Sequence, residues 1–252
     1  MSAAAVRVTS ENFYQNVSQV SAVVDLSGLT STYGMNIALY FIATNSDKYC
    51  DSGGNGNCGE IDLMETNGNG IMQTTVHSDH GKGAGNPQDY QYVWTGNTQN
   101  SAFQQPTSFK SGEWDVSSLS SEIMSSQVKL VAQFSQDSAT GKYNGLKVTL
   151  SKTDGSNPQP IFDSSLTNDG SDGKCSDKNI GGGQNIDWDA VTKDMQEGQV
   201  LVVSMHEYYA PQPSCPSVWV DYSAKFTPLC TQTQGPILKD MTITAASAHP
   251  RT

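Results

Sequence analysis

The feature that most constrains the fold is a series of short apolar runs rich in Val, Ile, Tyr and Phe, recurring along a chain of 252 residues. Runs of this length and composition are typical of β-strands. They are Ser21–Val24, Asn36–Ala43, Val128–Phe134, Leu146–Leu150, Val200–Met205 and Ser217–Tyr222, with a last strand expected at Lys239–Ala245. Turn sequences such as Asn67-Gly-Asn-Gly70 separate them. The pattern predicts an all-β chain built as a two-sheet sandwich.

Helical periodicity is faint by comparison. It predicts at most two short helices, at Val116–Met124 and Asp189–Met195. Two longer segments between the strands, Ser78–Gln105 and Ser151–Ile186, are polar and rich in glycine, and we expect them to be loops. No internal repeat or linker divides the chain, so residues 1–252 are expected to form a single domain.

The charge balance excludes some classes of partner. The chain has 25 acidic against 14 basic residues, a net charge of -11, which makes nucleic acid a poor partner because phosphate repels it. No apolar run approaches the roughly 18 residues of a membrane span. The first seven residues lack the pattern of a signal peptide, so the chain is either cytosolic or begins at a mature or engineered start. We expect a monomer.

Cysteine usage favours secretion over the cytosol. The five cysteines are Cys50, Cys58, Cys175, Cys215 and Cys230, and their spacing matches no zinc site. Cys50 and Cys58 flank a glycine-rich loop suited to a disulfide, and Cys215 and Cys230 offer a second pair. The sequence Asn16-Val-Ser18 is a glycosylation acceptor, which suits a surface loop of a secreted protein.

Three acidic residues carry the main functional signal. Glu60, Asp62 and Glu65 follow one another at i, i+2 and i+5. In a strand the first two point to the same face, whereas Glu65 joins them only if a one-residue bulge follows Asp62. The alternative is a solvated strand edge with three surface carboxylates and apolar residues on one face only. The intervening Ile61, Leu63 and Met64 favour a strand covered on both faces, with the acids lining a cleft.

Such a group of carboxyls has a known chemical use. Two acids about 5–5.5 Å apart are what a retaining glycosidase requires, one as nucleophile and one as acid/base. Crowding three like charges is unfavourable unless one carboxyl stays protonated, and a raised pKa is also what a general acid needs.

The same segment resembles known enzymes. Glu60-Ile-Asp-Leu-Met-Glu65 resembles the Glu-x-Asp-x-x-Glu signature shared by glycoside hydrolase families 7 and 16. Further segments resemble family 7 and occur in the same order between Val20 and Tyr222. They are Tyr33–Phe41, Tyr49–Ser52, Thr75–His77, Val200–Tyr209 and Trp219–Asp221. The resemblance implies a β-jelly-roll of two curved antiparallel sheets with a concave substrate cleft.

It also implies a role for each matching residue. Glu60 would be the nucleophile, Glu65 the acid/base, and Asp62 would assist ionisation of the nucleophile. His77 matches a histidine beside the acid/base, and Trp219 matches a tryptophan on which a sugar ring stacks. Positions that match contacts to the nucleophile or the nearby sugar are Asn36, Tyr40, Asp51 and Ser52.

No cofactor or metal is implied, and the partner is a β-glucan polysaccharide. A metal site formed by His77, Asp79, His80 and His206 is the alternative use of these histidines. His206 stands where the family has a sugar-stacking tryptophan, so we expect it to bind substrate.

The chain is much shorter than family 7 domains and has fewer cysteines, so the long loops that roof a tunnel are expected to be missing. This predicts an open cleft and endo-cleavage of β-1,4-glucan. Two alternatives stay open: a family 16-like β-1,3- or mixed-linkage glucanase, and a glycan-binding jelly roll without turnover.

Overall fold

Ten strands and one helix form the part of the chain that the computed structural model describes, namely residues 5–25, 35–43, 58–66, 72–78, 90–95, 127–156, 158–164, 186–207 and 237–250. Their bounds are β1 Ala5–Asp25, β2 Met35–Ile42, β3 Glu60–Thr66, β4 Met72–His77, β5 Tyr90–Thr95, β6 Gln127–Gln136, β7 Tyr143–Lys152, β8 Gln159–Asp163, α2 Trp188–Glu197, β9 Gln199–Glu207 and β10 Ile237–Pro250. The fold is all-β, as the sequence predicts.

The strands form one continuous antiparallel sheet in the order β5-β4-β3-β2-β9-β1-β6-β7-β8, with β10 paired to β1. The predicted jelly-roll architecture is confirmed, and its two curved halves are continuous through β1. β1 joins the two halves because its 21 residues pair first with β9, over Ala5–Tyr14, and then with β6, over Gln19–Asp25. Asn16, between these two stretches, has a left-handed backbone with a φ of 51°. Such a residue is uncommon in a regular strand, and here it marks where β1 passes from one half to the other.

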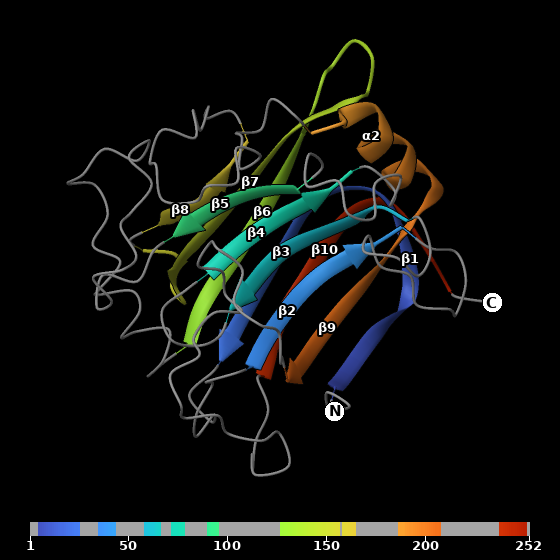
Figure 1. Cartoon of the computed structure of the whole chain (residues 1–252). Coiled ribbons are helices and arrows are strands. Elements are labelled where there is room, and N and C mark those ends of the chain that lie inside the picture. Colours follow the sequence, from blue (N-terminus) through green and yellow to red (C-terminus); the bar gives the residue numbers. More distant parts are fainter. Residues whose placement is uncertain are drawn as a thin grey trace.

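The two halves curl over a shared core (Figure 1). The core takes every second residue of the strands, including Leu39 and Phe41 of β2, Leu130 of β6 and Leu146 of β7. A second, smaller cluster lies on the opposite face of β2 and β9. It consists of Ala38, Tyr40, Ile42, Val200 and Val202, with Phe13 packed against it. The strands around β2 are therefore covered on both faces.

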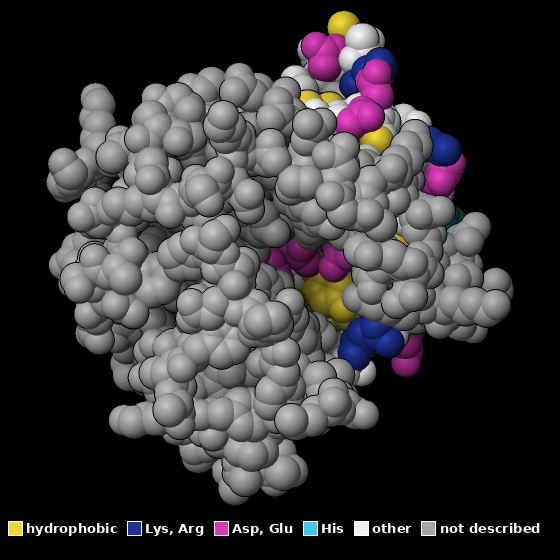
Figure 2. Space-filling model, in the orientation of Figure 1, with side chains coloured by type: hydrophobic (Ala, Val, Ile, Leu, Met, Phe, Trp, Pro, Cys, Tyr) yellow, Lys and Arg dark blue, Asp and Glu magenta, His cyan; other side chains and the backbone are white. Residues whose placement is uncertain are grey.

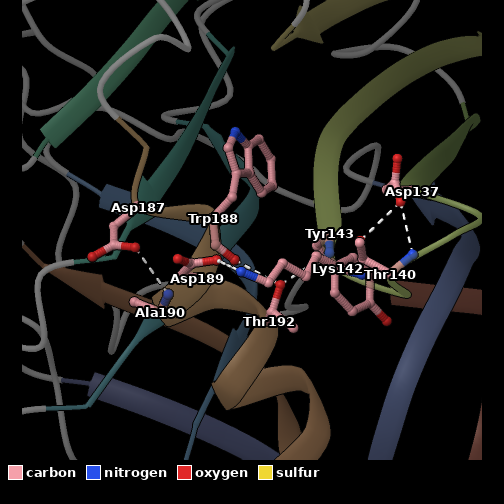
Figure 3. A network of polar contacts seen from close by, with 9 residues as sticks. All are labelled: Asp137, Thr140, Lys142, Tyr143, Asp187, Trp188, Asp189, Ala190 and Thr192. Atoms are coloured by element: carbon pink, nitrogen blue, oxygen red, sulfur yellow. Dashed lines mark hydrogen bonds and ion pairs between the residues drawn. The ribbon is translucent and has the colours of Figure 1, made fainter.

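Polar contacts attach α2 to both halves of the sheet, and Figure 3 shows those with the β6–β7 hairpin. Thr192 Oγ1 accepts a hydrogen bond of 2.9 Å from the backbone N–H of Tyr143, at the start of β7. The N-cap Asp187 accepts from the backbone N–H of Ala190 at 3.0 Å, which satisfies one free donor of the first turn. The backbone N–H of Asp187 in turn donates to the Ser78 hydroxyl at 2.9 Å. Ser78 directly follows β4, so α2 links the β6–β7 hairpin to the end of β4.

Most predicted elements are confirmed, with ends that differ from the prediction by one to three residues. These are Asn36–Ala43 in β2, Val128–Phe134 in β6, Leu146–Leu150 in β7, Val200–Met205 in β9 and Asp189–Met195 in α2. Val116–Met124 and Ser217–Tyr222 lie outside the described residues. No helix within the described ranges has the length and apolar character needed to cross a membrane.

The structure corrects four expectations. Ser21–Val24 is only the end of the long strand β1, so the acceptor sequence Asn16-Val-Ser18 lies within a strand and not in a loop. The Ser18 hydroxyl donates to the carbonyl of Thr244 at 3.3 Å. The last strand extends beyond Lys239–Ala245 to Pro250, because β1 pairs with it along most of its length. Strands β5 and β8 lie in the segments expected to be loops.

A buried hydrogen bond should hold β7 to β1 at the point where β1 changes partners. The Tyr143 hydroxyl donates to the carbonyl of Val17 at 2.8 Å. Tyr143→Phe leaves this buried carbonyl without its donor and should lower the free energy of unfolding by about 1–3 kcal/mol. Urea denaturation measures the change. Lys142→Ala is the control, because it removes an exposed ion pair and should cost less than about 1 kcal/mol. Equal losses in the two variants would contradict the assignment.

Candidate active site

The three acids lie on β3, an interior strand between β2 and β4. On β2, Leu39 pairs with Met64 whereas the next residue, Tyr40, pairs with Asp62. Leu63 is therefore an extra residue in β3, and the pairing with β4 shows the same shift between Asp62 and Glu65. The bulge that the spacing of the acids predicts is confirmed.

The bulge brings the acids to one face of the sheet. Directly opposed residues of an antiparallel pair point to the same face. Glu60, Asp62 and Glu65 lie opposite Ile42, Tyr40 and Ala38, respectively. These three β2 residues belong to the smaller cluster, on the face turned away from the shared core. All three carboxyl groups therefore project from that face.

The acids are not surface carboxylates on a strand edge. Asp62 is 4% exposed and Glu65 is 6% exposed, while Glu60 is half-buried. Figure 2 shows a recess near the middle of one face of the molecule, with acidic and hydrophobic side chains at its floor. The recess lies over the position that β3 and β2 occupy in Figure 1. The burial of Asp62 and Glu65 excludes the alternative of a solvated strand edge with three surface carboxylates.

Burial and charge both act on Asp62. Burial raises the pKa of the Asp62 carboxyl well above its ordinary value of 3.8, and the negative charge of Glu65 raises it further. A side-chain hydrogen bond with Glu60 acts in the opposite direction but is the smallest of the three effects on this pKa. Two carboxyl groups share a hydrogen bond only if one of them carries a proton. Asp62 thus lies between the two glutamates, in contact with one and within the field of the other.

The backbone register locates several of the other expected residues. Tyr40 is 4% exposed and lies opposite Asp62. His77 occupies the position opposite Glu60 on β4. Asn36 on β2 lies opposite His206 on β9, two residues along β2 from the position that pairs with Glu65.

Asp51, Ser52 and Trp219 lie outside the described residues, as do the Asp79 and His80 of the alternative metal site. Cys58 is buried, and its predicted partner Cys50 is also outside these ranges, so the pairing stays a prediction.

Sequence reasoning missed two polar residues in the row of Glu65. Ala38 lies opposite Ser204 on β9, and Ser204 lies opposite Arg7 on β1. The face that carries the acids therefore continues across two more strands to an exposed arginine. No local motif could reveal this, because β1 and β9 are almost 200 residues apart in sequence.

No protein-family profile and no curated protein matches this sequence. Among solved structures, the chain is similar to a family 7 cellobiohydrolase from Daphnia pulex, with 15% identity and a TM-score of 0.46, covering 81% of this chain and 62% of that one. It is also similar to the endocellulase EGI of Humicola insolens, with 15% identity and a TM-score of 0.45, covering 78% of this chain and 57% of that one. A third similar structure is SCLam, a non-specific endo-β-1,3(4)-glucanase of family 16, with 15% identity and a TM-score of 0.37, covering 78% of this chain and 49% of that one. The chain thus spans less than two thirds of each of these structures.

The raised pKa of Asp62 has a consequence for stability. The folded state holds this proton more tightly than the unfolded chain, so the contribution of Asp62 to stability is fully present below pH 3.8 and is lost as the pH rises through the folded pKa. Asp62→Asn removes this dependence. Its melting temperature, compared with that of the wild type, should therefore rise steadily from pH 3 to pH 7.

Thermal unfolding over that pH range provides the measurement. Glu11→Gln, which neutralises an exposed carboxylate on β1, is the matched control. A difference between Asp62→Asn and wild type that stays constant with pH would contradict the raised pKa.

Proposed function

We propose that this chain is a retaining glycoside hydrolase, an endo-acting β-glucanase that cleaves internal β-1,4-glucosidic bonds of cellulose-like glucans. The observation that carries the proposal is the projection of three carboxyl groups from one face of an interior strand, with Asp62 hydrogen-bonded to Glu60 and close to Glu65. A glycan-binding protein has no need of three crowded acids. A retaining glycosidase needs one carboxylate and one carboxylic acid at the same pH.

The difference in burial within the acid group supports the assignment of Glu60 as nucleophile. Burial and the charge of Glu65 raise the pKa of the Asp62 carboxyl, whereas the side-chain hydrogen bond with Glu60 acts in the opposite direction. Glu60 is only half-buried, so its carboxyl group is more accessible to a substrate than that of Asp62 or Glu65. An ionised, partly accessible carboxylate is what attack on an anomeric carbon requires.

The proposed reaction proceeds in two steps with net retention of configuration. Glu65 donates a proton to the departing glycosidic oxygen while a Glu60 oxygen bonds to the anomeric carbon, and the glycosidic bond breaks. Glu65, now a carboxylate, takes a proton from water, whose oxygen attacks the same carbon and releases Glu60. Asp62 holds Glu60 in place through both steps. Neither a metal nor a cofactor takes part.

The rest of the site is assigned from the sequence resemblance. Trp219 would stack on a glucose ring and His77 would lie near the leaving group. Asn36, Tyr40, Asp51, Ser52 and His206 would bind sugar hydroxyls. The proposal includes a single catalytic domain over residues 1–252, a monomeric and secreted protein, and a substrate that is a neutral polysaccharide.

The amide variants test the roles of the acids. Glu60→Gln and Glu65→Gln should each lower kcat by about a hundredfold to ten-thousandfold, because each group acts mainly in the transition state. Asp62→Asn should cost less, since Asp62 only assists. Reducing-sugar release from a soluble cellulose derivative, lichenan and laminarin gives the rates, with the first expected to be fastest. Circular dichroism checks that each variant is folded.

The outcomes separate the alternatives. If laminarin is cleaved fastest, the assigned linkage changes from β-1,4 to β-1,3, and the proposed retaining mechanism stays the same. Near-full activity of folded Glu60→Gln would refute the assignment of the nucleophile. Binding of glucan by a wild-type protein that shows no turnover on any of the substrates would favour the glycan-binding alternative.

The mode of attack is a separate prediction. The segments around β5 and β8 are polar and glycine-rich and hold few bulky side chains that could anchor a roof over several sugars. We expect an open cleft, so the viscosity of a soluble β-glucan should fall well before many reducing ends appear. Viscometry and reducing-end assays on the same reaction measure both. A disaccharide as the dominant product from the first minutes, with viscosity nearly unchanged, would exclude endo-cleavage.

A further inference from the structure

The bulge in β3 contacts Thr74 of β4, a residue that belongs to none of the functional motifs described above. Leu63 and Met64 together oppose a single residue of β4, Thr74, since Asp62 pairs with Thr75 and Glu65 with Gln73. Leu63 is 0% exposed and Met64 is 1% exposed, and both belong to the shared core. Two consecutive core residues are incompatible with a regular strand, in which neighbours point to opposite faces. The bulge therefore has to be maintained at this point.

A bulge interrupts the ladder of backbone hydrogen bonds and leaves the extra residue without a regular strand partner. Here the extra residue is Leu63, and its carbonyl accepts a hydrogen bond of 3.0 Å from the Thr74 hydroxyl. Thr74 is 0% exposed, so water does not supply this donor. A buried carbonyl without a donor is unfavourable, and the side chain of Thr74 supplies what the strand pairing does not.

The position of Glu65 depends on this bulge. With a regular register after Asp62, every following side chain of β3 would change faces. Glu65 would then point into the shared core, among residues such as Leu39 and Leu63, and Met64 would take its place beside Asp62. The bulge is thus the difference between a strand with two acids on the recessed face and a strand with three.

We propose that Thr74 is a positioning residue of the candidate active site, which acts through the Leu63 carbonyl to hold Glu65 on the same face as Glu60 and Asp62. Its effect on catalysis rests on the proposed function, whereas its effect on the location of Glu65 does not. Thr74 is fully buried, and because its neighbours Gln73 and Thr75 pair with Glu65 and Asp62, its own side chain points to the opposite face, toward the core.

The test compares Thr74→Val with Thr74→Ser. Valine keeps the shape of threonine and removes the donor, whereas serine keeps the donor and removes a methyl group. Thr74→Val should lower kcat by about 10- to 100-fold with KM within about twofold, because misplacing a reacting group affects the transition state more than ground-state binding. Thr74→Ser should keep kcat within about threefold of the wild type. Both variants should melt a few degrees lower, so melting temperature alone does not distinguish them.

The pH profile adds a readout that a loss of stability would not change. The limb of kcat/KM that reports the general acid should shift in Thr74→Val and stay in place in Thr74→Ser. Wild-type kcat and pH profile in a folded Thr74→Val would overturn the proposal. So would an equal loss of kcat in both variants. If Thr74→Val does not fold, Thr74→Ala also removes the donor and is compared with Thr74→Ser in the same way.

A second measurement separates this proposal from the proposed function. Carbon-13 NMR titration of the Asp62 carboxyl needs no substrate. In Thr74→Val the pKa of Asp62 should fall relative to the wild type, because the charge of Glu65 moves away, and in Thr74→Ser it should not. A wild type that cleaves no β-glucan would refute the function alone. An Asp62 titration unchanged in Thr74→Val would refute the positioning role alone.

Discussion

One extra residue in β3 is the constraint on which the rest of the site depends. The bulge at Leu63 lets two consecutive apolar side chains enter the shared core while the acids on either side remain on the other face. A strand with strict alternation has no way to satisfy both demands, since its side chains change faces at every residue. Within the bulge, the carbonyl of Leu63 accepts a hydrogen bond from a buried hydroxyl of the neighbouring strand, that of Thr74. Packing and chemistry are therefore specified by the same local irregularity.

Burial of the acid group also lowers the stability of the fold. Asp62 and Glu65 are almost fully buried next to each other, and burial costs free energy because each carboxyl group loses its hydration. The surrounding strands, covered by apolar clusters on both faces, hold them there. Groups kept in an unfavourable environment by a stable scaffold are common at functional sites, where the environment changes their protonation. The pattern at β3 fits that principle.

The sequence predicted the local features well and the long-range ones poorly. The spacing of Glu60, Asp62 and Glu65, with apolar residues between them, was enough to predict a bulge, because parity within a strand is a local property. The full length of β1 was not predictable, since its first half contains the polar run Thr9–Asn12 and pairs with β9, almost 200 residues away. The role of Asn16 as the point where β1 changes partners has the same cause. Arg7 and Ser204 share a row with Glu65 only through that distant pairing.

The pairing of β1 also has a consequence for how the chain reaches its fold. β1 lies in the first tenth of the sequence, yet one edge pairs along most of its length with β10, more than 200 residues later. Contacts of such long range make folding slow, because a large loop must close before they form. During synthesis that edge of β1 cannot pair with β10 until more than 200 further residues have emerged. An open, partly apolar strand is prone to pair with other chains. The expression yield of this protein should therefore depend on the rate of translation and on chaperones more than its final stability would indicate.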